Sequence, residues 1–186
     1  MYFRPFLTNP LGWFPRKGLL ADRRGAVAVE FAICASAFFA LLIACAQTVL
    51  IFFAQQALQT GAEAGARYIM TGQAKQAAMS AAQFRTYACG QMPRIFDCNN
   101  LIVDVRTATD FSNIDTDTPG ITYNPDGTVS NAWQFNSGGS QSIMIVRLMY
   151  FWNVQLGPLS LDFSNAGRGK RLLIGTMVFK SEPYRS

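Results

Sequence analysis

The fold of this protein is decided by one apolar stretch, residues 26–53, which reads AVAVEFAICASAFFALLIACAQTVLIFF. The stretch contains neither Gly nor Pro, and Glu30 is its only carboxylate. A helix of this length measures about 42 Å, whereas the hydrocarbon core of a membrane is about 30 Å thick. The stretch therefore predicts a helix that crosses a membrane, either tilted or with its last turns outside.

Basic residues are concentrated before this helix. Residues 1–25 contain five Lys and Arg side chains and one Asp, whereas residues 26–186 contain eleven basic and ten acidic side chains. By the positive-inside rule the N-terminus stays cytoplasmic and residues 54–186 are exported. A nucleic-acid binder gathers its positive charge on the folded domain. We therefore expect no nucleic-acid partner.

The residue types needed for catalysis or metal binding are scarce. Histidine is absent, which removes the commonest general base and a favoured metal ligand. The four cysteines have neither C-x-x-C nor zinc spacing. Asp115 and Asp117 are arranged like the opening of a calcium loop, but the glycine and glutamate of an EF-hand are missing, so a solvated turn is expected. We expect no enzyme, cofactor or metal site.

Three interpretations of the N-terminal region compete. A cleaved signal peptide would use Ala35-Ser36-Ala37, but strong hydrophobicity continues well beyond that point. An uncleaved signal anchor is the second interpretation, and a prepilin-type leader is the third. Glu30 favours the third, because a charge at the centre of a membrane segment costs about 2.5–3.5 kcal/mol and is usually paired or functional.

Residues 23–31, RRGAVAVEF, resemble a type IV prepilin cleavage motif. The Glu-Phe pair, the leader length and the chain size are similar to those of the TadE-like pseudopilins of tight-adherence (Flp) pilus systems. Weaker resemblances, which extend the likeness over residues 22–186, are Thr71-Gly72-Gln73, Cys89 with Cys98, the strand at 103–106 and the closing residues 179–184.

The resemblance implies that a membrane-bound prepilin peptidase cuts between Gly25 and Ala26. Residues 1–25 would then be the leader, 26–53 the transmembrane helix and 54–186 the exported domain. Glu30, followed by Phe31 in the motif, would pair with the new ammonium group of Ala26 in a neighbouring subunit or in its own chain. An opposite charge within reach makes a carboxylate tolerable in an apolar bundle.

The implied function is that of a non-catalytic minor pilin or pseudopilin, needed for assembly of a Flp-type pilus. Its partners would be the membrane, the peptidase, other pilin subunits and the assembly platform. It would lie in the bacterial inner membrane with a periplasmic C-terminal domain, either within the platform or incorporated in the fibre. The alternative hypothesis is an uncleaved, membrane-tethered periplasmic binding module that captures a ligand with the polar loop at 111–141.

The helix is expected to continue to about Met70. Gly61 and Gly65 have a spacing that permits close helix approach, but we favour a weakened helix end. A second helix is expected over 75–91. If the domain reaches an oxidising compartment, Cys89 and Cys98 form a disulfide; free thiols are the alternative.

Strand patterns follow at residues 101–108, 143–154 and 171–179. Together they predict an antiparallel sheet packed on a helix, and hence an α+β fold. Trp133 and Phe135 are candidates for an edge strand. The basic turn at 165–171 is interpreted as a solvated hairpin rather than an anion site.

Overall fold

The computed structural model describes residues 25–154, 157 and 161–183. Apart from Gly25, the predicted leader lies outside the described residues. The chain divides into two units, of which the first ends at Leu41 and the second spans residues 42–186. The described part of the first unit is the beginning of one helix, and the second unit holds the rest of that helix and the α+β fold.

Helix α1 spans Ala26–Met70. It ends where Gly72 adopts a left-handed conformation with φ of 78°. The amide of Gly72 donates to the carbonyl of Ile69 at 2.9 Å. Glycine is the residue that adopts this conformation at least steric cost, and it commonly terminates helices. The predicted end of the helix at Met70 is therefore confirmed.

The predicted helix over 75–91 is wrong in its continuity, because two helices occupy this region. They are α2 (Gln73–Gln76) and α3 (Ala81–Gly90). Ser80 caps α3: its hydroxyl accepts from the amide of Gln83 at 3.3 Å, while the Gln83 side chain accepts from the amide of Ser80 at 2.8 Å. This capping box starts a new helix. Its Ser-x-x-Gln pattern is visible in the sequence.

The three predicted strands are confirmed as β1 (Ile102–Ala108), β2 (Ile143–Asn153) and β3 (Lys170–Lys180). They form one antiparallel sheet in the order β1-β2-β3. The register places Asp104 opposite Arg147, and Arg147 opposite Thr176. The expected edge strand at Trp133 and Phe135 is reduced to a single bridge, in which Phe135 pairs with Val105. The predicted α+β class is confirmed.

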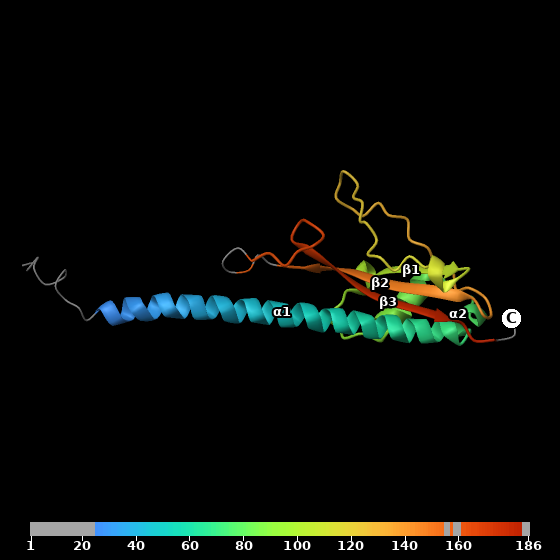
Figure 1. The fold of residues 1–186 in the computed structure, drawn as a ribbon, viewed down its shortest axis with the longest axis horizontal. Coiled ribbons are helices and arrows are strands. Elements are labelled where there is room, and N and C mark those ends of the chain that lie inside the picture. Colours follow the sequence, from blue (N-terminus) through green and yellow to red (C-terminus); the bar gives the residue numbers. More distant parts are fainter. Residues whose placement is uncertain (1–24, 155–156, 158–160, 184–186) are drawn as a thin grey trace, which may run out of the picture. The chain divides into compact units, whose positions relative to one another are not determined.

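The core of the second unit lies between the sheet and the two longer helices. Both views place the C-terminal part of α1 along the sheet, and Figure 1 shows the long segment between β1 and β2 rising from the opposite side. Side chains that are fully buried in this core come from every layer: Leu58 from α1, Phe84 from α3, and Val105, Val146 and Leu148 from the sheet.

Gly61 and Gly65 of α1 are the points where α3 and its C-terminal extension approach most closely. A Cβ atom at Gly65 would lie 2.8 Å from Cζ of Phe84, and one at Gly61 would lie 2.7 Å from Cγ of Met92. The expectation of a weakened helix end is therefore wrong. The two glycines make room for large side chains within the same chain, and α1 continues through both.

Candidate assembly site and its supporting domain

The predicted cleavage point coincides with the beginning of α1. Gly25 is the first described residue, and the helix starts at Ala26. A Cβ atom at Gly25 would meet no atom within 4 Å. Among the described residues, the peptide bond between these two therefore lies at a helix terminus with open space around Gly25.

Glu30 and Phe31 lie on the surface of the first unit. Glu30 is exposed, and Phe31 has 73% of its surface exposed. In the described part of the chain Glu30 takes part in no ion pair. Glu30 is four residues from Ala26, so one helical turn separates the two and brings them to the same side of the helix. The carboxylate thus has no partner within its own described chain.

The first unit carries an apolar surface that the described residues leave uncovered. Among residues 26–41 only Ala35 and Ala40 are partly buried. The large apolar side chains are exposed on all sides: Val27, Val29, Phe31, Ile33, Phe38, Phe39 and Leu41. A helix that is apolar all round is normally covered by lipid or by other helices. α1 is long and apolar enough to cross a membrane.

Further along, α1 is joined to the edge of the sheet by two glutamine side chains. Nε2 of Gln55 donates to the carbonyl of Ile174 at 2.8 Å. Gln59 both donates to the carbonyl of Thr176, at 3.3 Å, and accepts from its amide, at 3.1 Å. These bonds occupy backbone groups of β3 that would otherwise be open to another strand. They also hold the helix in register with the sheet.

Asp104 and Arg147 form a buried charged pair on the face of the sheet that points away from α1. The Asp104 side chain is fully buried, and its Oδ2 lies 3.7 Å from Nη1 of the nearly buried Arg147. Oδ1 of Asp104 accepts from Nε of Arg106 at 3.0 Å and from the amide of Gln134 at 3.0 Å. Arg147 donates to the carbonyl of Asp115. The cluster therefore ties the long β1–β2 segment to the sheet.

Sequence analysis missed this cluster. The strand patterns at 101–108 and 143–154 contain Asp104 and Arg147 but did not pair these two residues, which lie 43 positions apart. The available signal was an arginine within the otherwise apolar run of β2. Asp115, which resembled the start of a calcium loop, instead lies 3.8 Å from Nη2 of Arg147, and its Oδ1 accepts from the amide of Asp117 at 3.0 Å.

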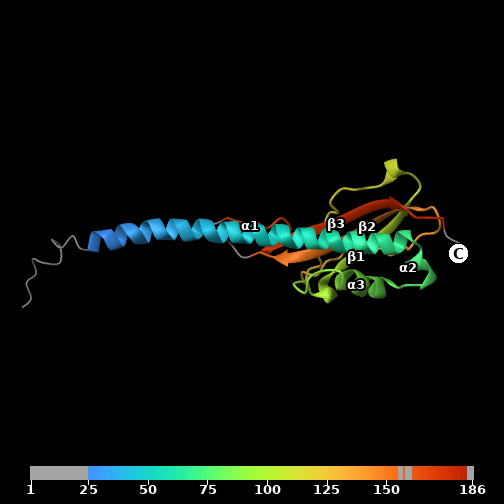
Figure 2. The same ribbon diagram turned by 90° about the horizontal axis from the view of Figure 1, so that it is seen from below.

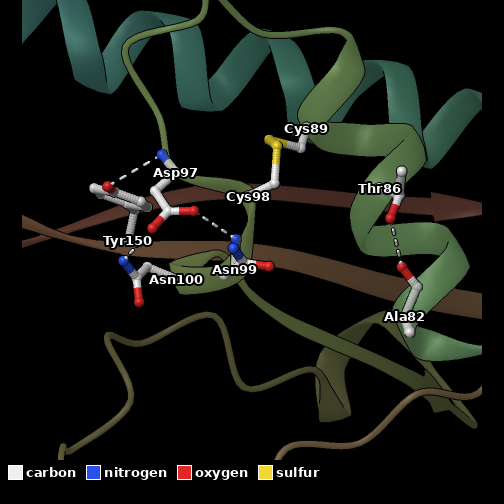
Figure 3. Close-up of a disulfide and its surroundings, with 8 residues drawn as sticks. All are labelled: Ala82, Thr86, Cys89, Asp97, Cys98, Asn99, Asn100 and Tyr150. Carbon is white, nitrogen blue, oxygen red and sulfur yellow. Dashed lines mark hydrogen bonds between the residues drawn. A yellow bond between two sulfur atoms is a disulfide. The ribbon is translucent and has the colours of Figure 1, made fainter.

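The disulfide between Cys89 and Cys98 is present and joins the end of α3 to the short helix η2 (Cys98–Asn100). Figure 3 shows Asp97 beside it, whose carboxylate accepts from the amide of Asn99 at 3.0 Å and from the side chain of Asn100 at 2.9 Å. The amide of Asp97 donates to the hydroxyl of Tyr150 at 3.3 Å. The connection between α3 and β1 is therefore held both covalently and by hydrogen bonds. Cys34 and Cys45 are free.

Two exposed aspartates have lowered pKa values for a local reason. Hydrogen bonds from the hydroxyl and amide of Thr128 lower the pKa of Asp126. Hydrogen bonds from Ser164 lower the pKa of Asp162 in the same way. Each aspartate accepts from the amide two residues ahead, at 2.9 Å and 2.8 Å respectively. These carboxylates are therefore turn-forming groups.

An open groove of about 860 Å³ lies beside the last turns of α1. Its lining includes Glu63 and Arg67 of α1, Tyr87 of α3, and Met177 and Phe179 of β3. The groove combines apolar walls with one charge of each sign. It is the larger of the two hollows described for this unit.

The long apolar helix, with an α+β unit built on its second half, fits a single-pass membrane protein. The family model described as TadE-like protein matches residues 25–67, from the glycine before α1 to the packing glycines near its end. The resemblance inferred from residues 23–31 is confirmed over this range, and it indicates involvement in a Tad pilus system. The weaker resemblances, at residues 71–73, 89 and 98, 103–106 and 179–184, lie outside the matched range. Comparisons with curated proteins and with solved structures found no match.

Proposed function

We propose that this chain is a minor pilin or pseudopilin that is cleaved between Gly25 and Ala26 and takes part, without catalysis, in assembly of a Tad pilus. The observation that carries the proposal is the exposed Glu30 on a helix surface that the described residues leave uncovered. The family match over the same segment supports it. The partners are the membrane, the prepilin peptidase, other pilin or pseudopilin subunits and the assembly platform.

Cleavage supplies the charge that Glu30 lacks. Before cleavage the amide of Ala26 is neutral; afterwards it becomes an ammonium group at the positive end of the helix. An uncompensated carboxylate within lipid costs a few kcal/mol, and an opposite charge within about 4–6 Å offsets that penalty. Pairing Glu30 with the Ala26 ammonium of a neighbouring subunit would therefore favour lateral packing of helices over isolated subunits in lipid.

The orientation follows from the charge distribution. Arg23 and Arg24 precede α1 directly, so the N-terminus stays cytoplasmic and the second unit is exported. Export to an oxidising compartment agrees with the Cys89–Cys98 disulfide, which cytosolic proteins rarely contain.

N-terminal sequencing of the protein extracted from membranes tests the proposal directly. In cells with an active prepilin peptidase, we expect the mature chain to begin at Ala26. The variant Gly25→Val should stay uncleaved, and because a Cβ at Gly25 meets no atom within 4 Å, it should fold normally. A wild-type chain that begins at Met1 in those cells would refute the proposal.

The alternative, a tethered binding module, makes a different prediction. Its candidate binding surface is the segment between β1 and β2, which lies on the side of the sheet away from α1 (Figure 1). Such a module should keep its function when residues 26–41 are replaced by an unrelated membrane helix. A pilin-like subunit should lose pilus assembly in the same replacement, because those residues form the packing surface.

A further inference from the structure

The hairpin between β2 and β3 is described at residues 154, 157 and 161–169, and this described part lies alongside α1 (Figures 1 and 2). Gly157, within this hairpin, is buried. A Cβ atom there would lie 3.1 Å from Oε1 of Gln47 in α1. The hairpin therefore covers one side of the helix within residues 44–55, where Ala44, Ile51 and Ala54 are buried.

A pocket of about 360 Å³ lies between this hairpin and α1. Its apolar walls are Ile51, Phe52, Phe163 and Leu173, and its polar lining includes Gln55 and Arg171. The volume is at the lower end of the range for small-molecule sites. Mixed apolar and cationic lining suits a ligand that has both a hydrocarbon part and an anionic part.

The charge around the pocket is positive. Arg171 uses Nη1 to donate to the carbonyl of Phe163 at 2.9 Å, which orients the guanidinium group within the pocket lining. Lys170, the residue before Arg171, is exposed, whereas the guanidinium group of Arg168 lies 5.5 Å from the centre of the Tyr123 ring. Asp162 is the only acidic residue in the sequence from 154 to 173. Arg171 is the charged residue in the pocket lining, and its positive charge complements an anion.

The pocket lies at the level where α1 should leave the hydrocarbon core. A core of about 30 Å accommodates about 20 helical residues, so a segment that starts at Ala26 reaches the far boundary near Ala46. The pocket begins two residues later along the helix, at Thr48. Phe52 is 69% exposed beside it, and an aromatic side chain is common at this depth.

We propose that this pocket binds one anionic phospholipid of the membrane that α1 crosses. The guanidinium group of Arg171 would pair with the lipid phosphate, and the apolar walls would receive the upper part of an acyl chain. The proposal uses the helix length calculated above, which ends the membrane-spanning part of α1 near Ala46 rather than at Phe53. The proposal depends on the membrane placement of α1 within the proposed function, but not on cleavage or on pilus assembly.

The full-length protein, purified in detergent and reconstituted in nanodiscs with equal phosphatidylglycerol and phosphatidylcholine, provides the test. Native mass spectrometry after release should show one phosphatidylglycerol retained in preference to phosphatidylcholine. Arg171→Gln should lower this retention about tenfold, as expected for losing one hydrogen bond to a charged group. The matched control Lys75→Gln removes an exposed charge in α2 and should leave retention unchanged.

A second variant separates loss of the lipid site from loss of the fold. Phe52→Ala shortens a largely exposed side chain of the pocket wall, so it should weaken retention without disturbing the core. Equal retention of the two lipids, or unchanged retention in both variants, would overturn the proposal. Displacement of the lipid by millimolar inorganic phosphate would show a site for free anions instead, and would overturn it as well. Because the assay uses purified protein, its result is independent of whether pili assemble.

Discussion

The contact between Gly175 and α1 gives the sharpest prediction about how the helix is joined to the sheet. Gly175 lies in β3, opposite Leu148 of β2, and a Cβ atom at this position would lie 2.7 Å from the carbonyl oxygen of Leu58. It would also lie 3.0 Å from the carbonyl carbon of Leu58 and 3.1 Å from Cβ of Ala62. Gly175→Ala therefore forces the helix and the strand apart.

The expected effect is large because the obstacle is backbone rather than a flexible side chain. Overpacking a well-packed core typically costs about 1–3 kcal/mol, and a clash with a helical carbonyl belongs in the upper half of that range. For a domain of roughly 150 residues, each kcal/mol lowers Tm by about 2–4 °C. We expect Gly175→Ala to lower the Tm of the second unit by about 4–12 °C.

Thermal unfolding of the full chain in detergent, followed by tryptophan fluorescence, measures this shift. Both tryptophans of the second unit, at 133 and 152, lie outside the membrane-spanning segment. Gly120→Ala is the matched control, because its added Cβ meets nothing within 4 Å. If the two variants unfold at the same temperature, the close packing of α1 on β3 described here is incorrect.

Three other substitutions test the assembly residue, the buried ion pair and the disulfide. Glu30→Ala should reduce pilus formation far more than it reduces leader cleavage. Immunoblots measure leader cleavage, and counts of pili measure assembly. Normal piliation in this variant would show that Glu30 does not pair with the Ala26 ammonium group during assembly. Asp104→Ala leaves the buried Arg147 without the carboxylate of Asp104. The free energy of unfolding, measured in urea, should therefore fall by about 3–5 kcal/mol. The control Asp115→Ala removes an exposed carboxylate and should change this free energy by less than about 1 kcal/mol. Cys89→Ser should lower the free energy of unfolding by about 2–3 kcal/mol, which is the stabilisation expected from a disulfide that closes a loop this short. An equal loss of stability in the wild-type protein treated with reductant would show that the disulfide bond, not the Cys89 side chain, is responsible.

The two halves of α1 have different surfaces, which suits the proposed function. The first turns are exposed on all sides, whereas residues 54–70 are buried along the faces that contact the sheet and α3. The glutamine bonds to β3 and the close packing at Gly175 join the second half of α1 to the sheet.

Much of this architecture could be predicted from sequence because it depends on local patterns. The apolar run from Ala26 to Phe53 predicts the membrane helix, and the alternation in residues 102–108 predicts a strand whatever it packs against. The boundary between α2 and α3 was also available locally, in the Ser80–Gln83 capping box, although the Ala-rich composition of 75–91 favoured one continuous helix. The proposed cleavage site between Gly25 and Ala26 also depends on a local pattern, residues 23–31, and it remains a prediction.

Only the tertiary structure decided the features that join distant residues. The burial of Asp104 depends on the strand register that places Arg147 beside it, and the role of Gln55 depends on α1 lying against the edge of β3. The same holds for Gly61 and Gly65, whose spacing signals a close approach but does not identify the neighbour. Periodicity shows which face of an element is apolar. Which partner covers that face is determined by the summed packing of the whole chain, and no single segment of sequence contains that information.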